Sequence, residues 1–164
     1  MNKILFVIDC DNFSYNNYNN AIKKINNEIK NADFKVTLFG DLNNKLKNKW
    51  VRSLQESKID NIIFYEIPIL KKKNITDHFI IVETMELLFN ESHDIFIFAS
   101  DDVDFIPLYQ KIKKYNKKIW QISQNRELSS LTDDYIDNKI NLFIEDIENI
   151  YTNEELILLV DESI

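Results

Sequence analysis

Two apolar runs in this chain each end abruptly in carboxylates. The run Ile95–Ala99 is followed by Ser100-Asp101-Asp102-Val103-Asp104-Phe105. Near the start of the chain, Lys3–Ile8 leads into Asp9-Cys10-Asp11-Asn12. Like charges at short range repel each other, so carboxylates gathered where strands stop oppose folding unless something offsets them. A divalent cation is the usual partner of such groups. The pattern therefore predicts one acidic site that is assembled from distant parts of the chain.

Segments of strand type alternate with segments of helical type along most of the sequence. Strands are expected at residues 3–8, 34–39, 62–67, 94–99 and 118–122, and helices at 18–31, 43–57, 76–90 and 105–115. This alternation predicts an α/β three-layer sandwich, with helices on both faces of a mainly parallel sheet of about five strands. Ligands bind such sheets beyond the carboxyl ends of the strands, where the strand order reverses. If the first and fourth strands are neighbours, their loops diverge above that crevice.

The last part of the chain is also expected to be helical, at residues 139–150 and 152–161. Thr152 and Glu155 have the spacing of a capping box. The apolar residues Leu156–Val160 indicate that a C-terminal helix within residues 151–164 packs against something. Either it caps the sheet or it makes an oligomer contact, which would give a homodimer. No linker rich in Gly, Pro or Ser interrupts the sequence, so residues 1–164 are expected to form one domain.

Composition and charge exclude several classes of protein. The single cysteine, Cys10, allows neither a disulfide framework nor a thiolate zinc site. No apolar segment approaches the roughly 20 residues that cross a bilayer. The sequence opens on a strand pattern rather than on a basic and apolar leader, which favours a cytoplasmic location. A net charge of -7 argues against coating nucleic acid through charge alone, but it is compatible with a nuclease whose acidic site binds metal.

Each acidic segment contains two aspartates that are separated by one residue. In an extended segment such residues point the same way, so Asp9 and Asp11 would share one side while Cys10 faces the other. Asp102 and Asp104 have the same spacing, and Asp104 also stands where the next helix starts. A single aspartate at that place more often caps a helix than binds a metal. Two such pairs, at the ends of two strands of one predicted sheet, favour a metal site.

These segments resemble the NYN domain, a branch of the PIN-like ribonucleases, over about residues 3–145. That family has an Asp-x-Asp/Glu-Asn element after its first strand, which Asp9-Cys10-Asp11-Asn12 matches. It has a lysine-rich loop that leads to an aspartate at a helix start, and the segment from Lys73 to Asp77 is similar. Its Ser-Gly-Asp-Ser-Asp-Phe element, followed by an apolar turn that often contains proline, corresponds in register to Ser100–Leu108.

The resemblance implies a cluster of metal-binding, catalytic aspartates with Mg²⁺ or Mn²⁺ as the cofactor. These are Asp9, Asp77, Asp102 and Asp104. Hard oxygen ligands in a half-open cluster suit both ions. Candidate substrate contacts are Asp11, Asn12, Tyr15, Lys73 and Ser100. Among them, Asn12 would shape the first loop or touch substrate, Tyr15 would stack on a base, and Lys73 would meet a phosphate.

Two positions depart from the family pattern. Asp101 replaces the family glycine, so the loop is expected to adopt an altered turn and gains a charge. Glu83 stands where many members have aspartate. It is either an accessory group of the site or part of a solvated polar stripe with Glu86 and Asn90. Asp101 is likewise an accessory group that tunes the site, or the mark of a protein that has drifted away from catalysis.

The leading interpretation is a metal-dependent nuclease, expected to be an endoribonuclease, that cleaves phosphodiester bonds of an RNA substrate. One alternative is a catalytically silent NYN-like module that binds RNA or a protein partner, which Asp101 and the negative charge favour. The other is a haloacid-dehalogenase-type phosphatase, a family that also starts with a strand and Asp-x-Asp. That family expects Thr or Val two residues after the second Asp, where this chain has Phe13.

Overall fold

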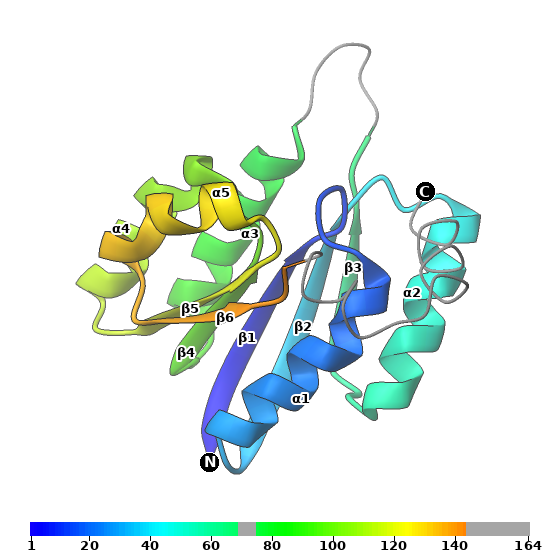
Figure 1. Ribbon diagram of the computed structural model, residues 1–164, viewed down its shortest axis with the longest axis horizontal. Helices are drawn as coiled ribbons and strands as arrows, with labels where there is room; N and C mark the ends of the chain where they lie inside the picture. The colour runs from blue at the N-terminus through cyan, green and yellow to red at the C-terminus, as the bar shows by residue number, and fades with distance from the viewer. Residues whose placement is uncertain (69–74, 144–164) are drawn as a thin grey trace.

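A six-stranded parallel sheet forms the centre of the computed structural model, which describes residues 1–68 and 75–143 (Figure 1). The strands are β1 (Asn2–Asp9), β2 (Ala32–Gly40), β3 (Ile62–Glu66), β4 (Ile95–Ala99), β5 (Lys118–Ser123) and β6 (Asn138–Asn141). Their spatial order is β3-β2-β1-β4-β5-β6, and every neighbouring pair is parallel. The first and fourth strands are therefore neighbours, and the strand order reverses between them.

Helices cover both faces of this sheet. They are α1 (Tyr18–Glu28), α2 (Asn44–Ser57), α3 (Thr76–Asn90), α4 (Ile106–Lys114) and the short α5 (Arg126–Ser129). Three 3₁₀ turns accompany them, η1 (Tyr15–Asn17), η2 (Val103–Phe105) and η3 (Ser130–Tyr135). Helices α1 and α2 pack on one face, and α3 and α4 pack on the other (Figure 1). The predicted three-layer α/β sandwich is confirmed.

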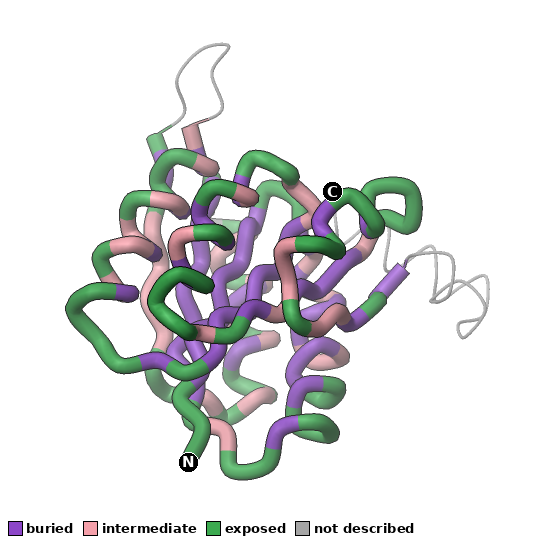
Figure 2. The backbone as a smooth tube through the Cα atoms, turned by 90° about the vertical axis from the view of Figure 1, so that its left-hand side faces the viewer, coloured by how far each residue is buried: buried purple, intermediate pink, exposed green. Residues whose placement is uncertain are grey.

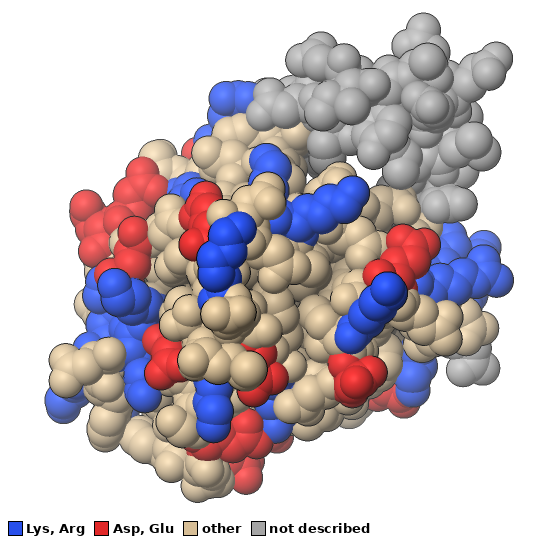
Figure 3. Space-filling view, turned by 90° about the horizontal axis from the view of Figure 1, so that it is seen from below, with Lys and Arg blue, Asp and Glu red and all other residues tan. Residues whose placement is uncertain are grey.

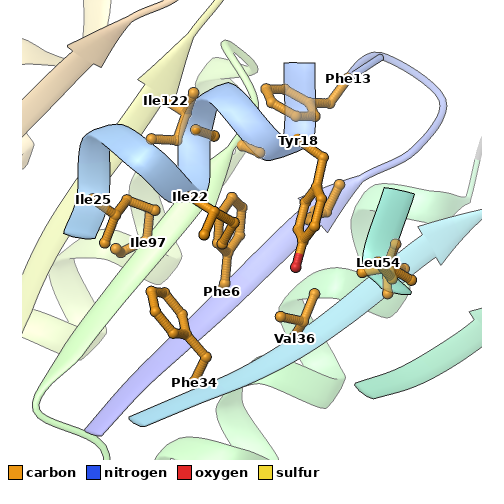
Figure 4. Packing of buried hydrophobic residues seen from close by; sticks show 14 of the residues in the cluster. Phe6, Phe13, Tyr18, Ile22, Ile25, Phe34, Val36, Leu54, Ile97 and Ile122 are labelled. Carbon is orange, nitrogen blue, oxygen red and sulfur yellow. The ribbon is translucent and has the colours of Figure 1, made fainter. Parts of the chain in front are cut away.

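The core beneath α1 follows from the helical spacing of its apolar residues. Tyr18, Ile22 and Ile25 lie on one side of the helix; Tyr18 and Ile22 point toward Phe6 of β1, and Ile25 points toward Ile97 of β4 (Figure 4). The Tyr18 ring also meets the ring of Trp50 from α2, with 6.0 Å between ring centroids. Trp50 is fully buried, and side chains of this size contribute about 3–5 kcal/mol each to the stability of a core. This packing fixes β1, which carries the first acidic segment.

The central strands are buried along their whole length rather than on alternate residues. In β1, all residues from Ile4 to Asp9 are buried, because their side chains alternate between the two helical layers. Figure 2 shows this as a continuous band of buried backbone between exposed outer turns of the helices. The buried residues extend to the carboxyl end of the strand, so Asp9, its last residue, is shielded from solvent.

The sheet contains one strand more than the sequence predicted, and the extra strand corrects a helix assignment. Residues 139–141 were expected to begin a helix, but they belong to β6, which pairs with β5 through Ile122 and Ile140. Only Ile140 of β6 is buried, so no alternating apolar pattern marked this edge strand, and pairing with β5 overrides local preference. The predicted helices beyond Phe143, including residues 151–164 and their proposed dimer contact, lie outside the described residues.

The amino ends of the strands carry charges of both signs. Figure 3 views this side of the molecule, where basic and acidic side chains are interspersed. Two acidic side chains near this side form ion pairs, Glu91 with Lys35 and Asp137 with Lys113. Within the described chain, no helix has the length and apolar character that crossing a membrane requires.

Candidate metal centre

The carboxyl ends of β1 and β4 meet the first turn of α3 at one edge of the sheet. Strand β1 ends at Asp9, and its register with β4 pairs Ile8 with Ala99. Helix α3 begins at Thr76 and packs against β1, which brings Asp77 to the same edge. The reversal of strand order thus gathers carboxylates from three separate segments of the chain.

Three of the predicted aspartates form a compact acidic trio. Asp77, Asp102 and Asp104 each offer one carboxylate oxygen, and these oxygens lie within 4.8 Å of one another. Two unit charges separated by 4.8 Å repel by roughly 3 kcal/mol at an effective dielectric constant of about 20. The repulsion among these three carboxylates therefore destabilises the folded protein in the absence of a cation.

The loop after β4 is shaped by its own side chains. The Ser100 hydroxyl accepts a hydrogen bond from the Asp102 N–H at 3.1 Å. Asp102 caps η2, because its Oδ1 accepts from the Asp104 N–H at 2.9 Å. The capping role that the sequence allowed for Asp104 belongs instead to Asp102, and Pro107 lies in the first turn of α4. The Asp104 carboxylate is thereby left to face the other two.

Asp9 is a fourth carboxylate beside the trio. It is 1% exposed, and burial raises the pKa of Asp9 to about 6, assisted by the charges of Asp11 and Asp102. The hydrogen bond that its Oδ2 accepts from the Asn12 side chain, at 2.7 Å, acts in the opposite direction on that pKa. Asn12 therefore holds the Asp9 carboxylate in place within the first loop.

Among the carboxylates at this edge, Asp77 has the pKa that is raised furthest. Burial raises the pKa of Asp77 to about 7, followed by its contact with the Asp102 carboxylate and the charges of Asp102, Asp9 and Asp104. Its Oδ1 is buried and has no hydrogen-bond partner in the described part of the chain. None of the ion pairs found within residues 1–68 and 75–143 includes any of these four carboxylates. An orphaned oxygen among hard, anionic donors fits a divalent cation.

Asp11 does not share the direction of Asp9. The chain turns at the end of β1, where the Asn12 and Phe13 N–H groups donate to the Asp9 carbonyl oxygen at 3.1 and 2.8 Å. Asp11 then accepts hydrogen bonds from the Thr76 hydroxyl at 2.6 Å and the Asp41 N–H at 3.1 Å. The prediction that both aspartates face one side is therefore wrong. Asp11 instead fastens the start of α3 to the end of β2.

Cys10 follows Asp9 directly and packs into the core beneath α1. It is buried among the residues beneath α1, and burial raises the pKa of its thiol well above the ordinary value. A protonated thiol in an apolar setting offers no metal ligand. The sequence's only cysteine is therefore part of the core and is not a candidate metal ligand.

The chain's single glycine was missed by motif analysis, although its rarity was a usable signal. Gly40 has φ of 156°, and a Cβ built on it would lie 2.8 Å from Asp11 Oδ1 and 3.1 Å from Cys10 Cβ. We expect Gly40→Ala to lower the free energy of unfolding by about 1–3 kcal/mol, because Asp11 must leave its two hydrogen bonds. Urea denaturation measures this change.

A double-mutant cycle tests that explanation. In an Asp11→Ala background the carboxylate is absent, so Gly40→Ala should cost clearly less than in the wild type. Equal costs in both backgrounds would show that the Asp11 carboxylate is not involved and that backbone strain or the contact with Cys10 is the cause.

Asp101 faces away from the trio, toward the end of β5. Its carboxylate accepts hydrogen bonds from the Ser123 hydroxyl and from the N–H groups of Gln124 and Asn125, the last two both at 2.9 Å. It is not among the described residues with positive φ, so the backbone here does not require glycine. The altered turn expected from this substitution is therefore not observed. The added charge is used to anchor a neighbouring loop.

The other predicted site residues are placed as follows. Tyr15 is 6% exposed and packs edge-on against Trp50, so the prediction that it stacks on a base is wrong in this structure. Ser100 is buried and orients Asp102. Glu83 is half-buried on α3, acts on the pKa of Tyr65, and is not part of the trio. Lys73 lies outside the described residues.

Comparisons with known proteins agree with this architecture. No curated protein sequence matches the chain. Among solved structures, a protein of unknown function from Vibrio parahaemolyticus, VPA0982, has a TM-score of 0.64 at 18% identity, covering 88% of this chain and 94% of its own. A UDP-N-acetylglucosamine 2-epimerase has a TM-score of 0.53 at 14% identity, covering 85% of this chain and 41% of the epimerase. At these identities, the two structures establish a shared fold only.

The family comparison is more specific than the structural one. The family model described as the NYN domain matches residues 3–155. The match spans β1, which ends in Asp9, as well as Asp77 and the loop that carries Asp102 and Asp104. It covers nearly all of the 164 residues. The chain therefore belongs to the NYN domain family.

Proposed function

We propose that this protein is a metal-dependent ribonuclease that cleaves RNA phosphodiester bonds with Mg²⁺ or Mn²⁺. One observation carries the proposal. Carboxylate oxygens of Asp77, Asp102 and Asp104 converge within 4.8 Å, and no basic side chain of the described residues pairs with them. Membership of a nuclease-like family supplies the reaction class, since the NYN domain is a branch of the PIN-like ribonucleases.

Each residue at the edge of the sheet where these carboxylates meet has a defined role in this proposal. Asp77, Asp102 and Asp104 hold the cation, and Asp9 adds negative charge beside them. A bound cation lowers the pKa of a coordinated water and stabilises the charge that develops on the phosphodiester. Ser100 and Asn12 keep Asp102 and Asp9 in place through hydrogen bonds of 3.1 and 2.7 Å. The Asp11–Thr76 bond holds the first turn of α3, and so positions Asp77.

The geometry gives less support to a phosphatase that forms an aspartyl-phosphate. Such an enzyme needs a nucleophilic aspartate that substrate can reach. Asp9, the residue in the matching position, is 1% exposed, and both of its oxygens accept hydrogen bonds, from the Asp11 N–H and the Asn12 side chain. Asp101 also gives no support to a silent module, because its charge is satisfied away from the trio.

A cleavage assay tests the proposal. Metal-stripped protein is incubated with a panel of end-labelled RNAs in Mn²⁺, in Mg²⁺ and in EDTA. We expect cleavage with either metal and none in EDTA. Calorimetric titration with Mn²⁺ on the same preparation reports whether the ion binds. Folded protein that binds Mn²⁺ but leaves every RNA intact would contradict ribonuclease activity, and folded protein that binds no Mn²⁺ would contradict the metal centre as well.

A further inference from the structure

A cleft of about 840 Å³ opens directly beside the acidic trio. Three loops line it: residues 10–14 after β1, residues 100–103 after β4, and residues 124–128 after β5. Asp102 belongs both to the trio and to the lining of the cleft. The volume lies in the range of roughly 300–1,000 Å³ that is typical of pockets for small ligands. A chemical group bound there would sit next to whatever the trio acts on.

The outer wall of this cleft, formed by residues 124–128, is held in place by Asp101. Its carboxylate accepts hydrogen bonds from Ser123, Gln124 and Asn125, so the loop after β5 is tied to the loop after β4. The Asn125 side chain in turn accepts from the N–H groups of Glu127 and Leu128 and caps α5. The position of α5 relative to the trio therefore depends on the side chain that stands at the family's glycine position.

A second tie supports the same wall from within the core. The Gln121 side chain donates to the Ser100 carbonyl oxygen at 2.8 Å and accepts from the Thr132 hydroxyl at 2.6 Å. Both Gln121 and Thr132 are fully buried. The wall is thus built on two sets of hydrogen bonds that both begin in the loop after β4, which also carries the trio's Asp102.

The chemistry of the lining identifies the kind of group that fits. The lining has one basic side chain, Arg126, and four carboxylic side chains, Asp11, Asp101, Asp102 and Glu127. A phosphate would be repelled there, because the acids outnumber the base. Apolar surface is available from Leu128 and Leu131, which are 40% and 53% exposed, and polar groups from Asn12 and Gln124. A flat, uncharged group that donates N–H bonds suits such a lining, and nucleobases have this character.

We propose that the cleft receives the base of a nucleotide adjacent to the cleaved phosphate, and that Asp101 is a positioning residue that holds the wall of this base site. The inference rests on the proposed ribonuclease function and deepens it. A base enters such a cleft only when it is unpaired and unstacked. A strand bound in this way keeps its phosphates outside the cleft and places one base inside it.

Neutral nucleosides test the base site without any cleavage step. Adenosine, guanosine, cytidine and uridine are titrated into ¹⁵N-labelled metal-free protein, with ribose as the control ligand. We expect amide shifts at Gln124, Asn125 and Leu128 with at least one nucleoside and none with ribose. Leu128→Asp should abolish the shifts, since it removes apolar surface from the wall, whereas Val82→Asp, which likewise puts an aspartate in place of an exposed aliphatic residue but on α3, should leave them unaltered.

Two substitutions of Asp101 separate positioning from charge. In Asp101→Asn, the amide oxygen can accept from Gln124 and Asn125 while the NH₂ donates to the Ser123 hydroxyl, so nucleoside affinity should stay near that of the wild type. Asp101→Ala removes all three bonds and should weaken nucleoside binding by roughly tenfold or more. Both variants should bind Mn²⁺ like the wild type. In cleavage assays, Asp101→Ala should raise KM more than it lowers kcat.

The outcomes distinguish this inference from the function on which it rests. If RNA is cleaved but no nucleoside shifts the amides of residues 124–128, the base site is wrong and the ribonuclease proposal stands. If nucleosides bind there but every RNA stays intact, the ribonuclease proposal fails and the base site stands. If Asp101→Asn loses affinity as fully as Asp101→Ala, or if Leu128→Asp and Val82→Asp behave alike, the role assigned to the wall is overturned. The Leu128 comparison holds even if Asp101→Ala fails to fold.

Discussion

Replacing Asp102 with asparagine is expected to lower Mn²⁺-dependent RNA cleavage by at least about 100-fold, because a metal ion contributes several kcal/mol to the reaction and each 1.4 kcal/mol is a factor of ten. The substitution is nearly isosteric. The asparagine oxygen can still accept the Asp104 N–H bond that caps η2, so the loop should keep its shape. The loss would therefore come from the missing charge at the trio. Initial rates on a single-stranded RNA, at saturating Mn²⁺, measure it.

The control is an aspartate at the opposite end of the sheet. Asp60 is exposed and precedes β3, so Asp60→Asn makes the same change in net charge far from the trio. Asp60→Asn should cleave like the wild type, and both variants should have wild-type circular dichroism. Cleavage by Asp102→Asn at a rate close to that of Asp60→Asn would remove Asp102 from the proposed mechanism.

Replacing Asp77 with asparagine should stabilise the metal-free protein while weakening its response to metal. The pKa of Asp77 is raised from 3.8 to about 7. At pH values between these two, the folded state therefore keeps a proton that the unfolded state has already lost. The free energy of unfolding therefore falls as pH rises from about 4 to 7 and is then constant. Asp77→Asn removes this decline. With a discount for partial exposure, we expect a gain of about 1–2 kcal/mol at pH 8 in EDTA.

Thermal melts at pH 5 and pH 8, in EDTA and in Mn²⁺, measure both halves of this expectation. A ligand that binds only the folded state stabilises it by RT ln(1 + [L]/Kd), so the wild type should gain from Mn²⁺ and Asp77→Asn, with its larger Kd, should gain much less. Asp9, with a pKa raised to about 6, leaves a residual decline at lower pH in the variant. If the Asp77→Asn variant is less stable than the Asp60→Asn variant in EDTA at pH 8, the repulsion inferred for the trio is contradicted.

The sequence pattern was sufficient for the layers of the fold, because buried parallel strands read as continuous apolar runs. Ile4–Ile8 and Ile95–Ala99 are such runs, and helical spacing on either side placed the covering helices. The sequence pattern was insufficient for β6, because its four residues include a single buried side chain. These residues form a strand because they pair with β5. Edge strands of this kind have no local signal, since their stability comes from a neighbour that is distant in sequence.

At the site, the sequence named three aspartates whose carboxylates converge, Asp77, Asp102 and Asp104, but not how the carboxylates around them are directed. The turn after Asp9 sends Asp11 toward Thr76, and an expectation based on extended backbone could not include that turn. Asp101 appeared anomalous because its partners, Ser123 to Asn125, lie in a different loop. Tyr15 follows the acidic segment in sequence, but its ring packs in the core against Trp50. In each case the missing information was a tertiary contact.

The buried state of Cys10 makes the protein convenient for site-specific labelling. Its thiol is the only one in the sequence, is 8% exposed and is held protonated, so maleimide reagents will react with it slowly. A cysteine introduced on an exposed position, such as the outer surface of α3, would then carry a fluorophore at one defined place without prior removal of native thiols. Energy transfer from that dye to an end-labelled oligonucleotide would report where on the molecule the strand lies.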